Sequence, residues 1–284
     1  MAAATATSSR RRRRRASAVN SGAVIRSSII RDARRGRGGV TGPAGTDDTI
    51  EYSVDTDRFV RELPRRFTRY PSSKHPRDRR FSPILEDVGG LAKENNLALL
   101  NLAASLLGPG ESYVEVGSFK GLSLIAAMLG NTGDFVGIDN FSLGGGSRKQ
   151  LEANLRRHGL GGHTLLEGDA FRVLASGALG DRRVGVYYYD AAHDYGSQVR
   201  GLRLIEPYLA DHALLIVDDT DWEQVARALR DYLASQPRAE LLVKLDGKDF
   251  GQPWWWEGVQ VLRWRPGAAP GARRRTSGRA RRGV

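Results

Sequence analysis

Residues 113–123, Tyr-Val-Glu-Val-Gly-Ser-Phe-Lys-Gly-Leu-Ser, decide the fold of this chain. The first four residues, β-branched or aromatic with one acid, predict a buried strand, and the apolar segment 122–129 after the turn predicts a helix. Gly117 and Gly121 flank the turn, where the lack of a Cβ lets the backbone approach a ligand closely. Glu115 comes near the carboxyl end of the strand, where open α/β sheets bind ligands. Its carboxylate suits an ammonium group or hydroxyls better than a bare phosphate.

Beyond this stretch, strands and helices alternate with short connections. The predicted strands lie at 112–117, 134–139, 163–168, 184–190, 213–218, 239–245 and 259–264. The predicted helices lie near 120–130, 147–159, 170–176, 196–210 and 221–235. Two earlier helical segments precede them, one that starts after Pro83 and one whose apolar stripe runs from Leu97 to Leu107. This alternation predicts a doubly wound, Rossmann-like α/β fold with a seven-stranded, mostly parallel sheet. Only the loop 246–258 separates the last two strands, so we expect an antiparallel C-terminal hairpin.

The spacing Glu-x-Gly-x-x-x-Gly-x-Ser over 115–123 resembles the first motif of class I S-adenosylmethionine-dependent methyltransferases. It is most similar to that of the small-molecule O-methyltransferases, the group that includes catechol O-methyltransferase. The stretch is not a P-loop, because no Gly-Lys-Ser/Thr follows, and it lacks the Gly-x-Gly-x-x-Gly of dinucleotide-binding folds. Five β/α units followed by a hairpin are also the strand pattern of the methyltransferase sheet. The resemblance spans residues 83–264 and implies S-adenosylmethionine as the cofactor; a tight strand–helix connection without a ligand is the alternative.

The net charge of +12 is concentrated at the two ends of the chain. Residues 1–49 carry +8 and residues 265–284 carry +7, which leaves −3 for residues 50–264. We predict that 1–49 and 265–284 are disordered basic tails, that 50–82 is an irregular lead-in, and that 83–264 is the class I methyltransferase domain. Because the folded part is mildly acidic, nucleic acid is not expected to bind to it.

Composition also excludes several classes of protein. The chain has no cysteine, so disulfides, thiolate metal sites and a cysteine nucleophile are ruled out. No apolar run approaches the roughly 20 residues of a membrane span, and the N-terminus lacks the apolar core of a secretory signal. We therefore expect a cytoplasmic protein without a membrane partner. Organelle targeting by residues 1–31, which contain no acid, stays open, as do a merely solvated tail and nonspecific binding of nucleic acid or membrane.

The second and third strands each end in residues suited to a nucleoside. Asp139 closes Phe-Val-Gly-Ile-Asp about 20 residues after the glycine turn, where an acid can accept both hydrogen bonds of a ribose diol. Gly168-Asp169-Ala170 resembles the adenine-binding step of the family. In that resemblance Asp169 accepts from the exocyclic amine and Ala170 lets the ring approach. The alternatives are that Asp139 caps the following loop and that Asp169 caps the next helix, the latter being compatible with binding.

The resemblance thus implies one set of cofactor-binding residues, with Glu115 at the methionine part, Asp139 at the ribose and Asp169 at the adenine. Asn140 adds a polar group beside Asp139. The full set is Glu115, Gly117, Ser118, Gly121, Ser123, Asp139, Asn140, Gly168, Asp169 and Ala170.

The fourth and fifth strands end in acids. In this topology both strands neighbour the first, so Asp190, Asp218 and Asp219 are expected to converge at one edge of the crevice. Three carboxylates with no Lys or Arg nearby in sequence repel one another, and a hard divalent cation such as Mg²⁺ removes that repulsion. The alternative is a capping box between Thr220 and Glu223, with the two aspartates merely leading into a helix.

This trio resembles the metal ligands of catechol O-methyltransferase-like enzymes. The form Asp-x-x-His-x-Tyr…Asp-Asp is more similar still to bacterial enzymes related to cephalosporin hydroxylase and macrocin O-methyltransferase. His193 lies three residues after Asp190, where the resemblance places a lysine base. Its reference pKa of about 6.5 suits a base at neutral pH, so we predict Asp190 and His193 as catalytic residues. A loop histidine that only orients Asp190 is the alternative.

These patterns predict a metal-assisted, S-adenosylmethionine-dependent methyltransferase acting on the hydroxyl of a small molecule. Trp222 and the run Trp254–Trp256 are predicted to wall an acceptor pocket or an interface, and the alternative is a hydrophobic plug under the hairpin. Two other functions stay open: a nucleic-acid-directed methyltransferase or binding protein that uses the Arg-rich tails, and a nicotinamide-dependent oxidoreductase. Neither the acceptor nor a homo-oligomeric state can be read from the residues.

Overall fold

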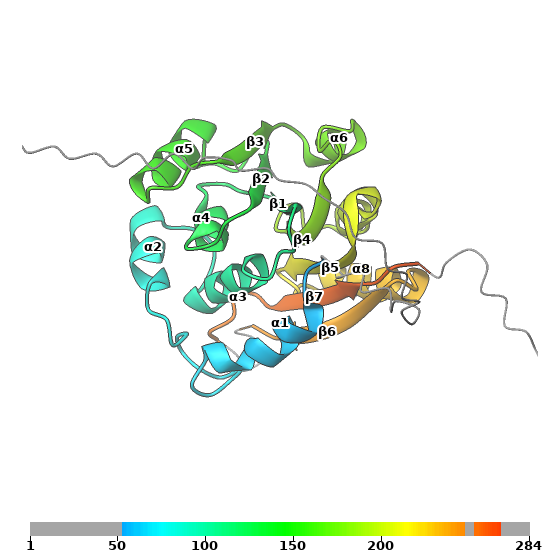
Figure 1. Ribbon diagram of the computed structural model, residues 1–284, viewed down its shortest axis with the longest axis horizontal. Helices are drawn as coiled ribbons and strands as arrows, with labels where there is room; N and C mark the ends of the chain where they lie inside the picture. Colours follow the sequence, from blue (N-terminus) through cyan, green and yellow to red (C-terminus); the bar gives the residue numbers. More distant parts are fainter. Residues whose placement is uncertain (1–52, 248–252, 268–284) are drawn as a thin grey trace, which may run out of the picture. The chain divides into compact units, whose positions relative to one another are not determined.

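A computed structural model of the chain describes residues 53–247 and 253–267 (Figure 1). The predicted disorder of residues 1–49 lies outside the described residues, as does most of the predicted C-terminal tail. Among the described helices, none combines the length and apolar character that crossing a bilayer would require.

The sheet has seven strands in the order β3-β2-β1-β4-β5-β7-β6 (Figure 1). The strands are β1 Glu111–Val116, β2 Asp134–Asp139, β3 His163–Glu167, β4 Arg183–Tyr189, β5 Leu209–Asp218, β6 Ala239–Leu245 and β7 Val259–Trp264. The first five pair in parallel, whereas β7 is antiparallel to both β5 and β6. The predicted α/β class, the doubly wound parallel sheet and the antiparallel C-terminal pair are therefore confirmed.

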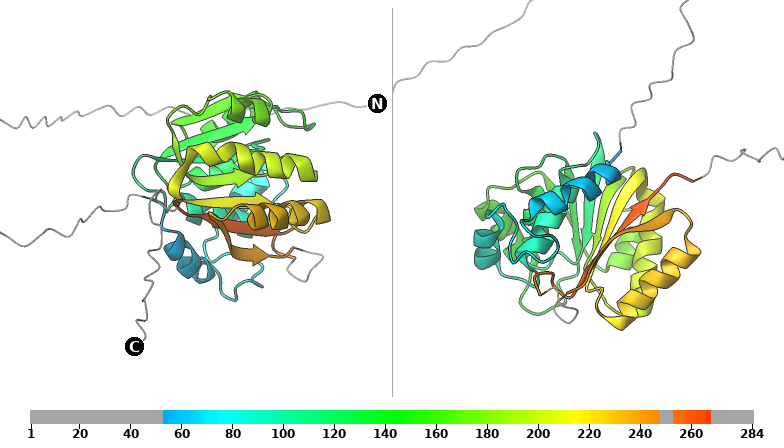
Figure 2. Two further views of the ribbon diagram at one scale, coloured as in Figure 1. Left: turned by 90° about the vertical axis from the view of Figure 1, so that its right-hand side faces the viewer. Right: turned by 90° about the horizontal axis from the view of Figure 1, so that it is seen from below.

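Helices cover both faces of the sheet (Figure 2). They are α1 Thr56–Glu62, α2 Phe81–Val88, α3 Glu94–Ala104, α4 Leu122–Met128, α5 Arg148–Arg157, α6 Ala170–Ala175, α7 Tyr195–Ile205 and α8 Glu223–Ser235. Successive strand residues point to opposite faces, so Tyr113 belongs to the core beneath α1–α5 and Val114 to the core beneath α6–α8. Each face of the sheet is therefore covered by its own apolar core, which leaves the carboxyl ends of the strands as the place for polar side chains.

Two predicted boundaries differ most from the structure. Helix α7 ends at Ile205 and not near residue 210, because Pro207 cannot continue an α-helix and the chain forms a single 3-10 turn over Glu206–Tyr208. Strand β5 consequently begins at Leu209, four residues earlier than predicted. The polar pair Asp211-His212 hides this part of the strand from a search for apolar runs.

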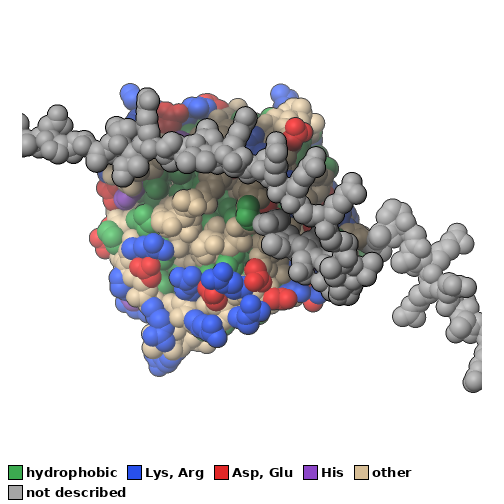
Figure 3. Space-filling model, in the orientation of Figure 1, with side chains coloured by type: hydrophobic (Ala, Val, Ile, Leu, Met, Phe, Trp, Pro, Cys, Tyr) green, Lys and Arg blue, Asp and Glu red, His purple; other side chains and the backbone are tan. Residues whose placement is uncertain are grey.

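The lead-in also holds more regular structure than predicted. It contains helix α1 and a 3-10 turn over Pro64–Arg66, and its aromatic anchors Phe59 and Phe67 are fully buried. Lys and Arg side chains gather on the lower part of the face in Figure 3, where Figure 1 places α1. The sequence of residues 53–82 accounts for this, with nine basic and four acidic residues. The basic character of the chain therefore extends from its tails into the lead-in.

Candidate active site

A cavity of about 570 Å³ opens at the carboxyl ends of the parallel strands. In an open α/β sheet this is the edge at which ligands bind, next to the point where the strand order reverses between β1 and β4. Most of the residues predicted from the sequence line it: Gly117, Ser118, Ser123, Asp139, Asn140, Gly168, Asp169, Ala170, Asp190, His193 and Asp219. Glu115, Gly121 and Asp218 are not among the lining residues, and their positions differ from those expected.

The glycine turn is shaped by the protein's own backbone. A Cβ on Gly117 would lie 1.7 Å from the carbonyl oxygen of Asp190, and the glycine has a φ of +96°. Gly117 therefore lets the main chain after β4 cross the end of β1, where we had expected it to make room for a ligand. Gly121 has a φ of +87° and begins helix α4, with the side chain of Leu151 3.1 Å from its missing Cβ. Its role in the fold is helix packing.

Glu115 lies beneath the cavity and is fully buried. Its carboxylate accepts hydrogen bonds from the hydroxyls of Tyr113, at 2.9 Å, and Ser123, at 3.2 Å. Burial raises the pKa of Glu115 to about 7. Ser123 lines the cavity, so its hydroxyl lies between this buried acid and the cavity.

Asp139 fastens two loops to the end of β2. Its Oδ2 accepts from the backbone N–H of Phe119 at 2.6 Å and its Oδ1 from that of Phe141 at 2.5 Å. Both phenylalanines have left-handed backbones, with φ of +46° and +53°, which non-glycine residues rarely adopt. Asp139 therefore caps the following loop, one of the alternatives drawn from the sequence, while its side chain still lines the cavity. Asn140 Oδ1 accepts from the N–H of Ser142 at 3.0 Å.

Asp169 caps helix α6. Its Oδ1 accepts from the N–H of Arg172 at 2.9 Å, which confirms the capping prediction. Gly168, Asp169 and Ala170 all line the cavity, so the cap faces the space where a planar ring could lie.

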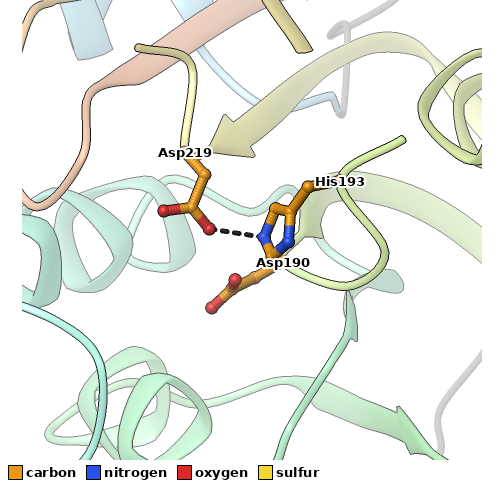
Figure 4. A group of neighbouring side chains, drawn as sticks. All are labelled: Asp190, His193 and Asp219. Carbon is orange, nitrogen blue, oxygen red and sulfur yellow. Dashed lines mark ion pairs between the residues drawn. The ribbon is translucent and has the colours of Figure 1, made fainter. Parts of the chain in front are cut away.

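Asp190, His193 and Asp219 form a compact group on the loops that follow β4 and β5 (Figure 4). One side-chain atom from each lies within 4.8 Å of the others, and His193 Nε2 is 2.6 Å from Asp219 Oδ2. Asp219 has a left-handed backbone with a φ of +55°, a strained conformation of the kind that clusters at functional sites. The indole of Trp222 lies 5.0 Å from the His193 ring, measured between centroids.

The electrostatics of this group are mutually dependent. Burial raises the pKa of Asp190 to about 7, and the negative charge of Asp219 adds to the shift. The contact with Asp219 raises the pKa of His193, against the opposing effect of partial burial. A proton or a cation is therefore stabilised among these three side chains.

Asp218 does not take the position predicted for it. It is 2% exposed, and its Oδ2 accepts from the hydroxyl of Tyr188 at 2.6 Å while its Oδ1 accepts from Asn96 Nδ2 at 3.4 Å. The group that could hold a metal ion contains His193 in its place. As the last residue of β5, Asp218 points toward the face covered by α3, whereas the left-handed turn at Asp219 directs that carboxylate toward His193.

The capping-box alternative for the acidic pair is also wrong. Helix α8 begins at Glu223 after Trp222, with no side-chain cap, and Thr220 Oγ1 has no hydrogen-bond partner among the described residues. Asp218 and Asp219 are therefore not there to start a helix.

Three site residues received no such role from the sequence, or only an ambiguous one. Asn96 of α3 and Tyr188 of β4 both line the cavity and both bind Asp218. Of the consecutive tryptophans, Trp256 lines the cavity, whereas Trp255 is fully buried against Phe67. Trp256 therefore lies in the wall of the cavity, and Trp255 is a core residue packed against the lead-in.

The donor set of the group suits a divalent cation. Two carboxylates and one imidazole offer oxygen and nitrogen ligands of the kind that Mg²⁺, Mn²⁺ and Zn²⁺ accept, and the cavity leaves room for water and substrate oxygens to complete the shell. Within this group, His193 and Asp219 also form an acid–histidine pair, in which the histidine can act as a base without a metal.

Comparison with known proteins agrees with the fold and with the motif. A family model described as a methyltransferase domain matches residues 114–220. A search of curated proteins found no match.

Solved structures with the same fold include three bacterial proteins. An O-methyltransferase from Bacillus cereus in complex with SAH is 15% identical with a TM-score of 0.52, over 67% of this chain and 92% of that one. A protein from Corynebacterium glutamicum is 16% identical with a TM-score of 0.55, over 75% and 99%. The O-methyltransferase TomG from Streptomyces achromogenes, involved in tomaymycin synthesis and bound to SAM, is 18% identical with a TM-score of 0.51, over 68% and 92%. At these identities the likeness establishes the fold. Residues 114–220 thus match a methyltransferase domain, in agreement with the class I S-adenosylmethionine-dependent methyltransferases that the first motif of the chain resembles.

Proposed function

We propose that this protein transfers a methyl group from S-adenosylmethionine to a hydroxyl oxygen of a small molecule. One observation carries the proposal. Most of the residues suited to the cofactor line the same cavity as the group Asp190, His193 and Asp219, at the carboxyl edge of the sheet. Solved O-methyltransferases of the same fold with SAM or SAH bound support the choice of cofactor.

The cofactor would lie along the ends of β1, β2 and β3. Ser118 and Ser123 offer hydroxyls at the end of β1 for the methionine part, with Glu115 behind Ser123. Asp139 retains lone pairs for a ribose diol after accepting from two backbone amides. Asp169 and Ala170 would flank the adenine, since the cap of α6 occupies only one carboxylate oxygen of Asp169.

The acceptor hydroxyl would lie against Asp190, His193 and Asp219, with the indoles of Trp222 and Trp256 beside it. His193 takes the hydroxyl proton while the oxygen forms its bond to the methyl carbon. The carbon–sulfur bond breaks at the same time, and its electron pair stays on the sulfur. Asp219 orients the imidazole and stabilises it once it is charged.

A divalent cation would be held by Asp190, Asp219 and His193, or by the two carboxylates with water if His193 serves as the base. When bound, such an ion lowers the pKa of a hydroxyl and fixes its orientation. Alignment of the oxygen with the methyl group supplies a further large part of the rate, since effective molarities in oriented reactions reach about 10⁵–10⁸ M.

Calorimetry with S-adenosylhomocysteine and, separately, with NAD⁺ and NADP⁺ tests the cofactor. Binding of the first in the micromolar range and none of the others is expected. Radiolabelled S-adenosylmethionine with a panel of phenols, sugars and hydroxylated polyketides then tests the acceptor, with and without EDTA. If the protein binds NAD(P) and ignores S-adenosylhomocysteine, the proposed function is wrong. Retained activity in EDTA would remove only the metal.

A further inference from the structure

We propose that Asn96 is a positioning residue. It holds Asp218, and through Tyr188 also Asp190, in a fixed position relative to Trp256 in the wall of the cavity. The effect on turnover rests on the proposed function. The effect on structure does not, and the two can be measured separately.

The first contact of Asn96 is with the carboxylates. Its Nδ2 donates to Asp218 Oδ1 at 3.4 Å, and the other oxygen of Asp218 accepts from the Tyr188 hydroxyl at 2.6 Å. The same hydroxyl lies 3.1 Å from Asp190 Oδ2. A chain of polar contacts therefore runs from helix α3 through Asp218 and Tyr188 to Asp190, which is a member of the Asp190–His193–Asp219 group. Satisfied on both oxygens, Asp218 holds Tyr188 in the position that fixes Asp190.

The second contact of Asn96 is with the wall. Its Oδ1 accepts from the backbone N–H of Trp256 at 3.0 Å, and Trp256 lines the cavity. The ammonium group of Lys93, at the start of the same helix, lies 5.5 Å from the centroid of the Trp256 indole. The first turn of α3 thus fixes both the backbone and the ring of this tryptophan.

An amide is the side chain that this place requires. Asn96 is 2% exposed, and a buried polar group is costly unless its donors and acceptors are paired. Its donor faces a carboxylate and its acceptor faces an N–H, so the two ends cannot be exchanged. An aspartate at position 96 would keep the acceptor for Trp256 but would lose the donor and set a further carboxylate against Asp218.

The neighbouring residue provides a matched control. Asn95 is also fully buried in α3, but its Nδ2 donates to the carbonyl of Ser73 in the lead-in, at 2.8 Å. It does not line the cavity. A general loss of helix or core stability would follow from a change at either residue, whereas a loss of positioning should follow only from a change at Asn96.

Amide hydrogen exchange at Trp256 in the ligand-free protein is the direct test. Asn96→Ala removes the acceptor of this N–H, so its exchange should be at least about tenfold faster than in the wild type. Asn96→Asp keeps the acceptor and should retain the protection, as should Asn95→Ala. In the methyl-transfer assay, kcat should fall in both Asn96 variants and stay near the wild-type value in Asn95→Ala. The Kd for S-adenosylhomocysteine should stay within about twofold throughout.

Unchanged exchange at Trp256 in a folded Asn96→Ala would overturn the proposal, even if the protein binds S-adenosylhomocysteine. Equal effects from Asn95→Ala would overturn it as well, since they would indicate general destabilisation. If Asn96→Ala does not fold, Asn96→Ser gives the exchange measurement, and Asn96→Asp with unaltered kcat would contradict the link to Asp190. If the wild type does not bind S-adenosylhomocysteine, the proposed function fails and the exchange result still decides the role of Asn96.

Discussion

His193 Nε2 lies 2.6 Å from Asp219 Oδ2, although the two residues follow different strands of the sheet. The contact raises the pKa of His193 and turns one ring nitrogen toward the carboxylate. Asp219 reaches it only because its backbone is left-handed, with a φ of +55°. The strained backbone of Asp219, predicted as a metal ligand, therefore brings its carboxylate to His193, the base predicted from the sequence.

Gly117→Ala should be severely destabilising. The added Cβ would lie 1.7 Å from the carbonyl oxygen of Asp190, and the φ of +96° is unfavourable for alanine. We expect a loss of at least about 3 kcal/mol in the free energy of unfolding, measured by denaturant titration. Gly110→Ala is the control, because Gly110 also has a left-handed φ, of +76°, but nothing lies within 4 Å of its missing Cβ. It should lose about 1–2 kcal/mol, and equal losses would mean that the clash at Gly117 does not matter.

Asp139→Asn should weaken both the loops and cofactor binding. Asparagine has one carbonyl oxygen, so either Phe119 or Phe141 would lose the acceptor of its N–H, at a cost of about 1–3 kcal/mol. Calorimetry with S-adenosylhomocysteine should show a clear rise in Kd. Asp134→Asn, at the other end of the same strand, removes the charge that pairs with Arg182 and should lower Tm without changing that Kd. A wild-type Kd in Asp139→Asn would remove Asp139 from the cofactor site.

The sheet was predictable because its signals are local. All seven strands carry apolar or β-branched runs, and the order of strands and helices determines how they pair. The ends of elements were less predictable where polar residues enter a strand, as Asp211 and His212 do in β5. The convergence of Asp190, His193 and Asp219 followed from topology, since the strands that precede them are neighbours in the sheet.

The division of labour between Asp218 and Asp219 was not predictable. Two adjacent acids look equivalent in a sequence, and only the left-handed turn at Asp219 separates their directions. Asn96 gave no signal either, because an asparagine within an apolar helix resembles any tolerated polar residue. Its partners Asp218 and Trp256 lie 122 and 160 residues away along the chain. Such long-range contacts are visible only in the folded protein.

Glu115→Gln should stabilise the ligand-free protein at alkaline pH. Burial raises the pKa of Glu115 from 4.5 to about 7, so the folded chain keeps a proton that the unfolded chain releases over this window. The wild type therefore loses stability as the pH rises from about 4.5 to 7, by at most about 3 kcal/mol, whereas the glutamine variant does not. The advantage of the variant should be small at pH 4.5 and reach its full size above pH 7.

Thermal unfolding at several pH values checks this expectation. The exposed Glu86→Gln makes the same chemical change without burial and should show no such trend relative to the wild type. A Glu115→Gln advantage that does not grow with pH would mean that the buried carboxyl is not protonated. The variant should also bind S-adenosylhomocysteine more weakly if Glu115 acts on the cofactor through Ser123.

Manganese binding to the ligand-free protein distinguishes two possible sets of metal ligands. The sequence predicts Asp190, Asp218 and Asp219, whereas Asp190, His193 and Asp219 lie together in the structure. If the ligands are those that lie together, Asp190→Asn and Asp219→Asn should each weaken Mn²⁺ binding at least about tenfold, by calorimetry or electron paramagnetic resonance. Asp218→Asn should have a smaller effect, because Asp218 binds Tyr188 and Asn96 and acts on the group only through Asp190. If Asp218→Asn and Asp219→Asn weaken Mn²⁺ binding equally, the ligands are the three aspartates that the sequence predicted. If the wild type binds no Mn²⁺ yet transfers methyl groups in EDTA, the His193–Asp219 pair alone must activate the acceptor hydroxyl, and His193→Ala should then abolish turnover.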